Sequence, residues 1–156
     1  MGTHYQGCPA VTDALCAYIN FIRAAESLSS RINQHLSGYG LTESQFGVLE
    51  VLHHLGPQCQ RDLANKLLKS GGNITLVIDN LEKQALVERR RNSGDRRYIT
   101  VSLTPQGAQL IADIFPVHAA LIHNLFDVLA PDEQNALREL CRRLGKQLPQ
   151  AVAESA

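Results

Sequence analysis

The sequence predicts a mainly α-helical fold with one small β-hairpin, an α+β architecture that occupies residues 1–156 as a single domain. Two observations predict this class. Through most of the chain apolar residues recur every three or four positions, which is the period of an amphipathic helix. Only over residues 86–103 does the period change to two, which is typical of short strands.

The first two helices are marked by their apolar faces and by the residues between them. A long helix is expected from Val11 to Leu36, and residues 38–40 (Gly-Tyr-Gly) end it. Thr42 and Gln45 then match a capping box, in which the Thr42 hydroxyl accepts a hydrogen bond from the third helical N–H and the Gln45 side chain reaches back. A second helix is therefore predicted to begin after Thr42 and to end at residues 56–57 (Gly-Pro).

Two shorter helices follow, with a tight break between them. The first is expected over residues 60–68 and the second over residues 73–85, and the Lys-Ser-Gly-Gly of residues 69–72 separates them. The second helix is predicted to bury one side, because its apolar positions follow the i, i+3, i+4, i+7 pattern; these are Ile74, Val77, Ile78 and Leu81. Two short helices joined by such a turn are typical of a helix-turn-helix unit, here residues 60–85.

A β-hairpin and two more helices complete the chain. Residues 86–91 and 98–103 are predicted to be strands joined by a turn, so the hairpin, or wing, spans residues 86–103. Thr104 and Pro105 match a helix N-cap and first helical position, and this helix is expected to kink at Pro116. A last helix is predicted from Pro131, with acidic residues at its positive end, so that residues 105–148 hold both helices.

Charge is distributed unevenly, although the chain carries 15 basic and 15 acidic residues and no net charge. Residues 1–57 have a net charge of −2, residues 58–100 carry nine basic and five acidic groups for a net of +4, and residues 101–156 return to −2. A basic centre between acidic ends indicates a module that meets a polyanion such as nucleic acid. The balanced total excludes a polybasic tail and an acidic disordered chain.

Several other classes of protein are not expected. No apolar run approaches the roughly 20 residues that span a bilayer, and no signal peptide opens the chain, so we expect a soluble, cytoplasmic protein with no membrane partner. The chain shows no nucleophile elbow, phosphate-binding loop or HExxH sequence, so an enzyme is not expected. The six histidines lack metal-ligand spacing, and neither a metal nor a cofactor is predicted.

The exposed face of the second helix-turn-helix helix carries residue types that read DNA. Asparagine pairs with adenine, leucine can contact a thymine methyl group, and glycines let a helix N-terminus approach a phosphate. The candidate contacts on this helix are Ser70, Gly72, Asn73, Thr75, Leu76 and Lys83. At the hairpin tip Arg96 and Arg97 form a cationic probe narrow enough for a minor groove, and Asp95 orients a guanidinium. Taken singly, each of these residues is as readily a solvated surface position, and at least one of the arginines at 89–91 is expected to face solvent or a phosphate.

The chain resembles the MarR family of winged helix-turn-helix transcriptional regulators in three runs: LTESQFGVLEVL, DNLEKQALVERR and SGDRRYITVSLTPQG. The resemblance covers about residues 11–146. It implies a homodimer in which the helices of residues 11–40 and 105–148 from both chains interlock, while two winged helices of residues 42–103 reach one pseudo-palindromic double-stranded DNA site. It also implies that Asp95 and Arg97 form the wing pair at the minor groove. Many relatives have Arg at the position of Leu76 and Gly at that of Ala85.

The resemblance further implies an effector, because members of that family respond to small aromatic acids, phenols or quinones, or to thiol oxidation. A pocket between the first, second and fifth predicted helices would draw on Phe21, Phe46, His53 and Phe115, which at helical spacing are otherwise core residues. The function predicted is thus a sequence-specific DNA-binding regulator, in its simplest form a repressor, that a phenolic or aromatic ligand releases.

Two alternatives remain open at this point. The first is a thiol-based, peroxide-sensing regulator that acts through Cys16, although the four cysteines lack CxxC spacing and are interpreted first as free thiols. The second is a winged helix that binds protein instead of DNA. Such a module would be expected to lack the wing arginines Arg96 and Arg97.

Overall fold

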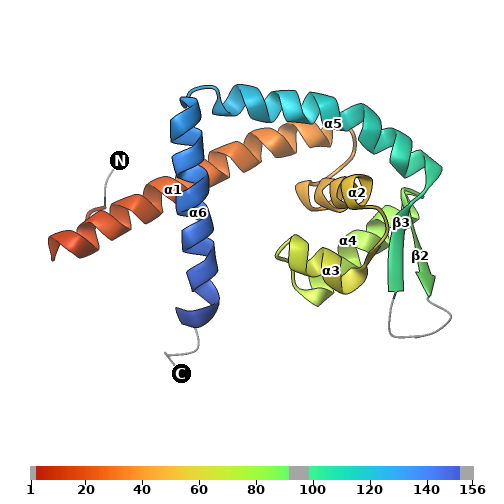
Figure 1. Cartoon of the computed structure of the whole chain (residues 1–156), viewed down its shortest axis with the longest axis horizontal. Coiled ribbons are helices and arrows are strands. Elements are labelled where there is room, and N and C mark those ends of the chain that lie inside the picture. Colours follow the sequence, from red (N-terminus) through yellow and green to blue (C-terminus); the bar gives the residue numbers. More distant parts are fainter. Residues whose placement is uncertain (1–2, 92–98, 152–156) are drawn as a thin grey trace. The chain divides into compact units, whose positions relative to one another are not determined.

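The computed structural model describes residues 3–91 and 99–151 and shows a mostly helical chain with a small antiparallel sheet (Figure 1). Its elements are α1 (Pro9–Ser37), α2 (Glu43–Leu55), β1 (Gln58–Cys59), α3 (Gln60–Lys66), α4 (Gly71–Lys83), β2 (Val87–Arg91), β3 (Ile99–Leu103), α5 (Pro105–Phe126) and α6 (Pro131–Ala151). The chain divides into two compact units, Met1–His118 and Ala119–Ala156. Mainly helical architecture with a β-hairpin is confirmed.

The long first helix and the capping box after it are confirmed. The Thr42 Oγ1 accepts a hydrogen bond from the backbone N–H of Gln45 at 3.2 Å, and the Gln45 Oε1 accepts from the backbone N–H of Thr42 at 2.8 Å. α2 ends as expected, because the backbone turns at Gly56 with a φ of 71°. Glycine adopts this left-handed conformation without a steric penalty.

The helix-turn-helix unit is present, but α4 begins earlier than the sequence predicts. Gly71 and Gly72 form the first turn of α4 and are not part of the break before it. Ser70 is the N-cap, and its Oγ accepts a hydrogen bond from the backbone N–H of Asn73 at 3.3 Å. In the turn between the helices Leu68 has a φ of 50°, where a side chain is strained. The break therefore lies two residues earlier than predicted, at residues 67–70, and keeps the same length.

The sheet has three strands, in the order β1-β3-β2, and not the two that the sequence predicts. The two strands of the hairpin pair antiparallel, with Val87 opposite Leu103 and Arg91 opposite Ile99. On the other side of β3, Gln58 and Cys59 of β1 pair antiparallel with Val101 and Thr100. Two residues immediately before a helix show no alternation, so periodicity could not reveal β1.

The core of the Met1–His118 unit is aliphatic and draws on every helix of that unit. Its fully buried side chains are Leu36, Val48, Leu49, Leu63, Ile74, Ile78, Leu81, Val101, Ile111 and Ile114. The predicted buried side of α4 is therefore confirmed. Gly107, in the first turn of α5, is also buried, and a Cβ there would overlap the carbonyl oxygen of Leu86. This close approach requires glycine and places α5 against the start of β2.

The Ala119–Ala156 unit consists of the end of α5, a short connection and α6. The Gln134 side chain donates to the carbonyl oxygens of Phe126 and Leu129 at 3.0 and 3.1 Å, which ties α6 to the connection before it. Leu137, Leu140 and Leu144 lie exposed at i, i+3, i+7 spacing on α6. An exposed apolar stripe of this kind is typical of a helix that packs against another chain.

α5 is more apolar over its length than the sequence analysis expected of any segment. α5 is 22 residues long and, by length and composition alone, apolar enough to cross a membrane. A single such helix is weak evidence of a membrane span. Ile111 and Ile114 of α5 are core residues, and the same helix carries Asp113, His118 and His123. It also runs through Pro116 as one helix.

Candidate nucleic-acid interface and effector cavity

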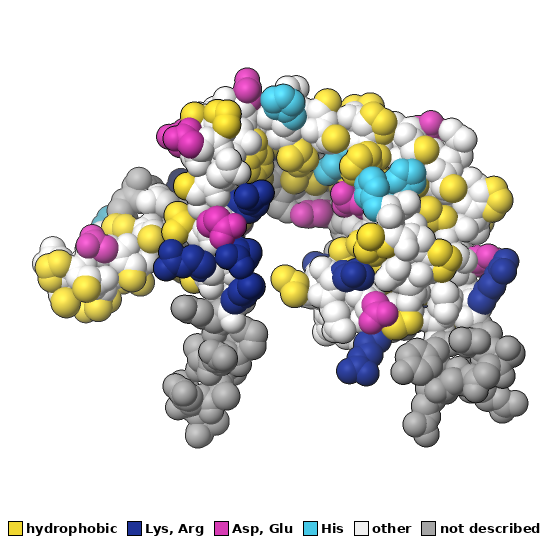
Figure 2. All heavy atoms as spheres, in the orientation of Figure 1, with side chains coloured by type: hydrophobic (Ala, Val, Ile, Leu, Met, Phe, Trp, Pro, Cys, Tyr) yellow, Lys and Arg dark blue, Asp and Glu magenta, His cyan; other side chains and the backbone are white. Residues whose placement is uncertain are grey.

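The exposed face of α4 is the candidate nucleic-acid interface. Gly72, Asn73, Leu76 and Lys83 are all exposed, and Leu76 leaves 61% of its surface in solvent. Ser70 is exposed as well, although its hydroxyl is engaged in capping the helix. Figure 2 shows Lys and Arg side chains that project from the helix-turn-helix and from beside the sheet. An exposed helix face with an amide, an apolar group and a cation suits the major groove.

Thr75 is held differently from the other predicted contacts. It is partly buried, and its Oγ1 donates to the carbonyl oxygen of Gly71 at 2.8 Å. The same oxygen accepts from the Nε2 of Gln60, the first residue of α3, at 2.6 Å. The Thr75 hydroxyl therefore joins α3 to α4, which leaves it less available to a base. Gln60 escaped the sequence analysis, because no local pattern links residues fifteen positions apart.

Arg89 of β2 points to α4 and not to solvent. Its Nη1 lies 2.5 Å from both the Asp79 Oδ1 and the Glu82 Oε2, and its Nη2 donates to the carbonyl oxygen of Thr75 at 3.2 Å. This contact engages the Asp79 carboxylate. Arg90 is 76% exposed and pairs with Glu88 at 2.8 Å, so Arg90 meets the expectation that at least one of these arginines faces solvent.

The wing tip cannot be placed in the same way. Asp95, Arg96 and Arg97 lie outside the described residues, and only the two strands that lead to them, β2 and β3, are described. Their role at the minor groove stays a prediction.

A cavity of about 320 Å³ lies within the Met1–His118 unit, and several of its walls carry polar groups. It is lined by Ile32, Glu43, Ser44, Phe46, Gly47, Glu50, Leu67, Lys69 and His118. These residues come from α1, α2, the turn before α4, and α5. The sequence predicted walls from the first, second and fifth helices. The structure adds a wall that was not predicted, the turn between α3 and α4.

His118 is the cavity residue with the most unusual surroundings. Its ring centroid lies 4.3 Å from that of Phe46 and 5.9 Å from that of His35. The Nδ1 of His118 and the Nε2 of His35 are buried and have no hydrogen-bond partner among the described residues. Burial lowers the pKa of His118, because desolvation disfavours the charged imidazolium; Glu50 opposes the shift and His35 adds to it. The neutral ring is therefore favoured.

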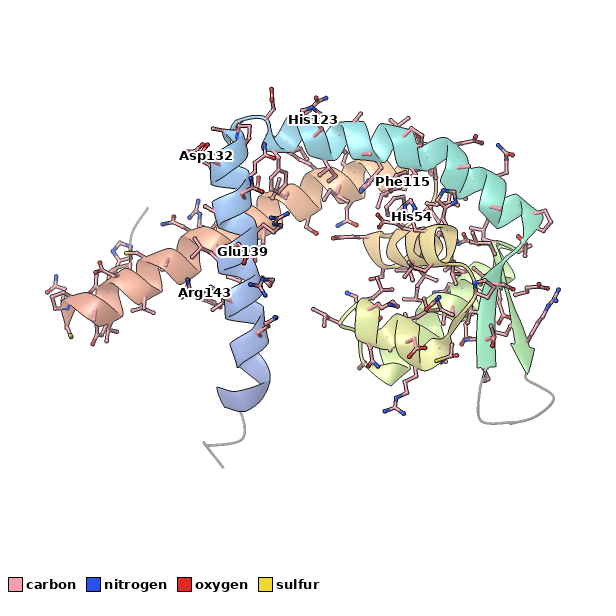
Figure 3. All side chains as sticks on the ribbon, in the orientation of Figure 1. His54, Phe115, His123, Asp132, Glu139 and Arg143 are labelled. Carbon is pink, nitrogen blue, oxygen red and sulfur yellow. The ribbon has the colours of Figure 1, made fainter. Side chains whose placement is uncertain are left out.

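Of the four residues predicted to bind an effector, His53 and Phe115 lie together, with ring centroids 6.3 Å apart, but only one of the four lines the cavity. Phe46 lines the cavity, but Phe21, His53 and Phe115 do not. Phe21 is exposed on α1. Phe115 instead contacts His54 across α2 and α5 with ring centroids 4.6 Å apart, as the two labelled side chains in Figure 3 show. Sequence reasoning missed Glu50, although it stands one helical turn after Phe46 on the same face of α2.

The remaining candidate chemistry is sparse. Cys16 is half-buried on α1, and all four cysteines are free thiols. Within residues 3–91 and 99–151 no cluster of three or more His, Cys, Asp or Glu side chains could hold a metal ion.

Comparisons with known proteins agree with this geometry. The MarR family model matches residues 41–99, which cover the helix-turn-helix and most of the wing. The HTH-type transcriptional regulator MhqR of Bacillus subtilis (strain 168) is 36% identical over 132 residues, which are 85% of this chain and 91% of that protein.

Two solved structures are similar over most of their length. One is a mutant MarR from E. coli complexed with operator DNA, with 25% identity and a TM-score of 0.77 over 85% of this chain and 95% of that one. The other is BpsR of Bordetella bronchiseptica, whose DNA binding is regulated by 6-hydroxynicotinic acid; it shows 26% identity and a TM-score of 0.75 over 83% and 98% of the two chains. The resemblance seen in the sequence is confirmed, and the chain belongs to the MarR family of winged helix-turn-helix, DNA-binding transcriptional regulators.

Proposed function

We propose that this protein binds a pseudo-palindromic DNA operator as a homodimer, represses transcription there, and is released by a small phenolic or aromatic ligand. The observation that carries the proposal is the place of the cavity. Leu67 and Lys69 line it, and the next residue, Ser70, is the N-cap of α4. A ligand in this cavity therefore contacts the turn from which the DNA-facing helix begins. A ligand that fits only a position of that turn absent from the DNA-bound form shifts the equilibrium away from the DNA-bound form.

The DNA half of the proposal is supported by the exposed face of α4. In this proposal Asn73 pairs with adenine, Leu76 contacts a thymine methyl group and Lys83 contacts a phosphate. Arg96 and Arg97, with Asp95, would follow the adjacent minor groove. The similar MarR structure contains operator DNA, which supports the same partner here.

The homodimer is supported by the exposed leucine stripe of α6. A helix with three exposed leucines on one face gains stability when a second chain covers them. Since the protein would act on DNA, we place it in the cytoplasm.

The charge of the cavity favours a neutral phenol over an aromatic acid. Two carboxylates, Glu43 and Glu50, face one cation, Lys69, and His118 favours its neutral form. Glu43 is already engaged, because its Oε2 accepts from Ser29 Oγ at 2.6 Å. Glu50 has no hydrogen-bond partner among the described residues, so its carboxylate is available to accept from a phenolic hydroxyl. A cavity near 320 Å³ is at the lower end of ligand pockets and suits a one-ring compound.

The thiol alternative has no comparable support. Cys16 is a half-buried free thiol on α1.

The DNA half is tested by selecting a duplex from a randomised library with the wild-type protein and measuring affinity by fluorescence anisotropy over a salt series. Arg97→Ala is expected to weaken binding and to flatten the salt dependence by about one counterion. Leu76→Ala is expected to cost about 1 kcal/mol and to relax the preference for one base pair. Leu55→Ala is the matched control, because Leu55 is similarly exposed at 55% but lies at the end of α2. A wild-type protein that enriches no duplex contradicts the proposal.

The ligand half is tested on the same duplex with hydroquinone and with benzoate. Hydroquinone is expected to release the DNA at lower concentration than benzoate does. Glu50→Gln removes one negative charge from the cavity and is expected to narrow that difference, whereas Glu26→Gln on the exposed side of α1 leaves it unchanged. Equal potency of the two compounds on the wild-type protein would contradict the phenol preference.

A further inference from the structure

We propose that Arg89 is a positioning residue for DNA recognition, which holds α4 in one rotation about its own axis relative to β2. This inference rests on the proposed function and concerns a residue outside the face that meets DNA. The argument begins with the three acceptors of its guanidinium. They are the carbonyl oxygen of Thr75 at 3.2 Å, the Asp79 Oδ1 at 2.5 Å and the Glu82 Oε2 at 2.5 Å.

These acceptors lie on one face of α4, since positions 75, 79 and 82 follow i, i+4, i+7 spacing. At about 100° per residue, this face is roughly a third of a turn from the core face and a similar angle from the exposed face. The core face is Ile74, Val77, Ile78 and Leu81. The exposed face includes Gly72, Asn73, Leu76 and Lys83. One side of α4 thus packs against the aliphatic core, a second side contacts Arg89, and the third side faces solvent.

Aliphatic packing and a guanidinium restrain a helix in different ways. Hydrophobic burial has no direction, so a small rotation of α4 costs little if the buried area stays similar. A planar guanidinium has donors in a fixed geometry, and it can satisfy three acceptors only when they are correctly oriented. The backbone N–H of Arg89 also donates to the Glu82 Oε1 at 3.0 Å, so Glu82 is held by two groups of β2. The Arg89 contacts therefore fix the rotation of α4 about its own axis, which hydrophobic burial alone does not determine.

Two simpler roles for Arg89 fit the structure less well. A phosphate contact needs an accessible cation, but the Arg89 side chain is only 19% exposed and its terminal nitrogens are engaged. A purely stabilising ion pair would satisfy every donor, yet the Arg89 Nε is buried with no hydrogen-bond partner among the described residues. Partly buried ion pairs also contribute little net stability, because desolvation offsets their attraction.

The test compares two duplexes of equal length: the one enriched by the wild-type protein from a randomised library, and a scrambled version of it. Arg89→Gln is expected to weaken binding to the enriched duplex at least tenfold more than binding to the scrambled one. Base-edge contacts need an oriented helix, whereas non-specific binding depends mainly on charge. Arg90→Gln, which loses the same charge from an exposed site, should lower the affinity for both duplexes by the same factor.

The ratio of the two affinities separates positioning from the other roles. A partly unfolded variant, or one that has lost a phosphate contact, loses affinity for both duplexes in parallel, and a parallel loss overturns the proposal. Arg89→Lys keeps the charge but not the planar donors. The ratio of its affinity for the enriched duplex to its affinity for the scrambled duplex is therefore expected to stay below that of the wild-type protein. Full recovery of the ratio by lysine overturns positioning, because charge alone would then suffice.

A variant that removes a negative charge instead of a positive one gives the sharpest outcome. It also keeps the proposal testable if the Arg89→Gln protein does not fold. Asp79→Ala removes a negative charge, which by itself strengthens binding to any DNA. If Arg89 positions α4 through Asp79, the variant binds the scrambled duplex more tightly and the enriched duplex less tightly. Stronger binding to both overturns the proposal. A wild-type protein that enriches no duplex at all instead refutes the proposed function, and the two failures are distinguishable.

Discussion

The Oγ1 of Thr104 donates a hydrogen bond to the carbonyl oxygen of Ala85 at 2.6 Å, although the two residues stand nineteen positions apart. The same Oγ1 accepts from the backbone N–H of Gly107 at 3.0 Å, so one hydroxyl caps α5 and holds the residue that follows the end of α4. Ala85 adopts a φ of 56° there, which is the left-handed region that favours glycine. A Cβ in this conformation is strained.

Replacing Ala85 with glycine should therefore stabilise the protein. Glycine has no Cβ to strain at this φ, and we expect the free energy of unfolding to rise by about 1 kcal/mol. Thermal and urea unfolding followed by circular dichroism would measure it. Ala112→Gly, at an exposed position inside α5, is the matched control and should lower the free energy of unfolding by about 1 kcal/mol. Destabilisation by both variants would show that Ala85 is not strained.

Gly107→Ala should have the opposite effect. The added Cβ would overlap the carbonyl oxygen of Leu86, and a backbone atom cannot move aside as a flexible side chain can. We expect a loss of about 2–3 kcal/mol in the free energy of unfolding. Gly72→Ala serves as the control, since no atom lies within 4 Å of a Cβ built there. A Gly107→Ala protein as stable as Gly72→Ala would disprove the close approach of α5 to Leu86.

The hydrogen bond between Gln60 and Thr75 should show coupling in a double-mutant cycle. Thr75→Val keeps the shape of the side chain and removes both hydrogen bonds of its hydroxyl, at an expected cost of about 1–2 kcal/mol. Gln60→Ala should cost less on its own. If the two side chains interact, the double variant loses less stability than the sum of the single variants. Strict additivity in urea unfolding would mean that the 2.6 Å contact contributes nothing.

Stability should fall in acid through His118. Its pKa in the folded protein lies below the ordinary value of about 6.5, chiefly because of burial. The unfolded chain therefore binds a proton more readily than the folded one. The contribution of neutral His118 to the free energy of unfolding is therefore complete above about pH 7. It decreases as the pH drops through 6.5 towards the lowered pKa. Glu43 and Glu50 from α2, His35 from α1 and Lys69 also face this region and set the local charge.

His118→Gln should remove part of this acid sensitivity. Urea unfolding at pH 7.5 and pH 5.5 would give the difference in free energy for each protein. His123→Gln is the control, because His123 is exposed on the same helix. If both variants keep the pH dependence of the wild-type protein, burial of His118 does not cause it.

Much of the fold could be predicted from the sequence, because its signals are local. The capping box of Thr42 and Gln45 and the buried stripe of α4 both depend on residues a few positions apart. The family also followed from short runs. The site was less predictable, since only Phe46 of the four residues expected to bind an effector lines the cavity.

The sequence by itself thus determined the helices, the two strands of the hairpin, their apolar faces and the exposed face of α4, but not β1. Helical and strand periods need no knowledge of distant residues. Only the tertiary structure decided which partners the polar side chains take. Arg89 turned to α4 while Arg90 faced solvent, and His118 met His35 across eighty-three positions of chain. The physical reason is that a charged or polar group has several acceptors of similar strength along the chain. The docking of helices and sheet selects the one within reach.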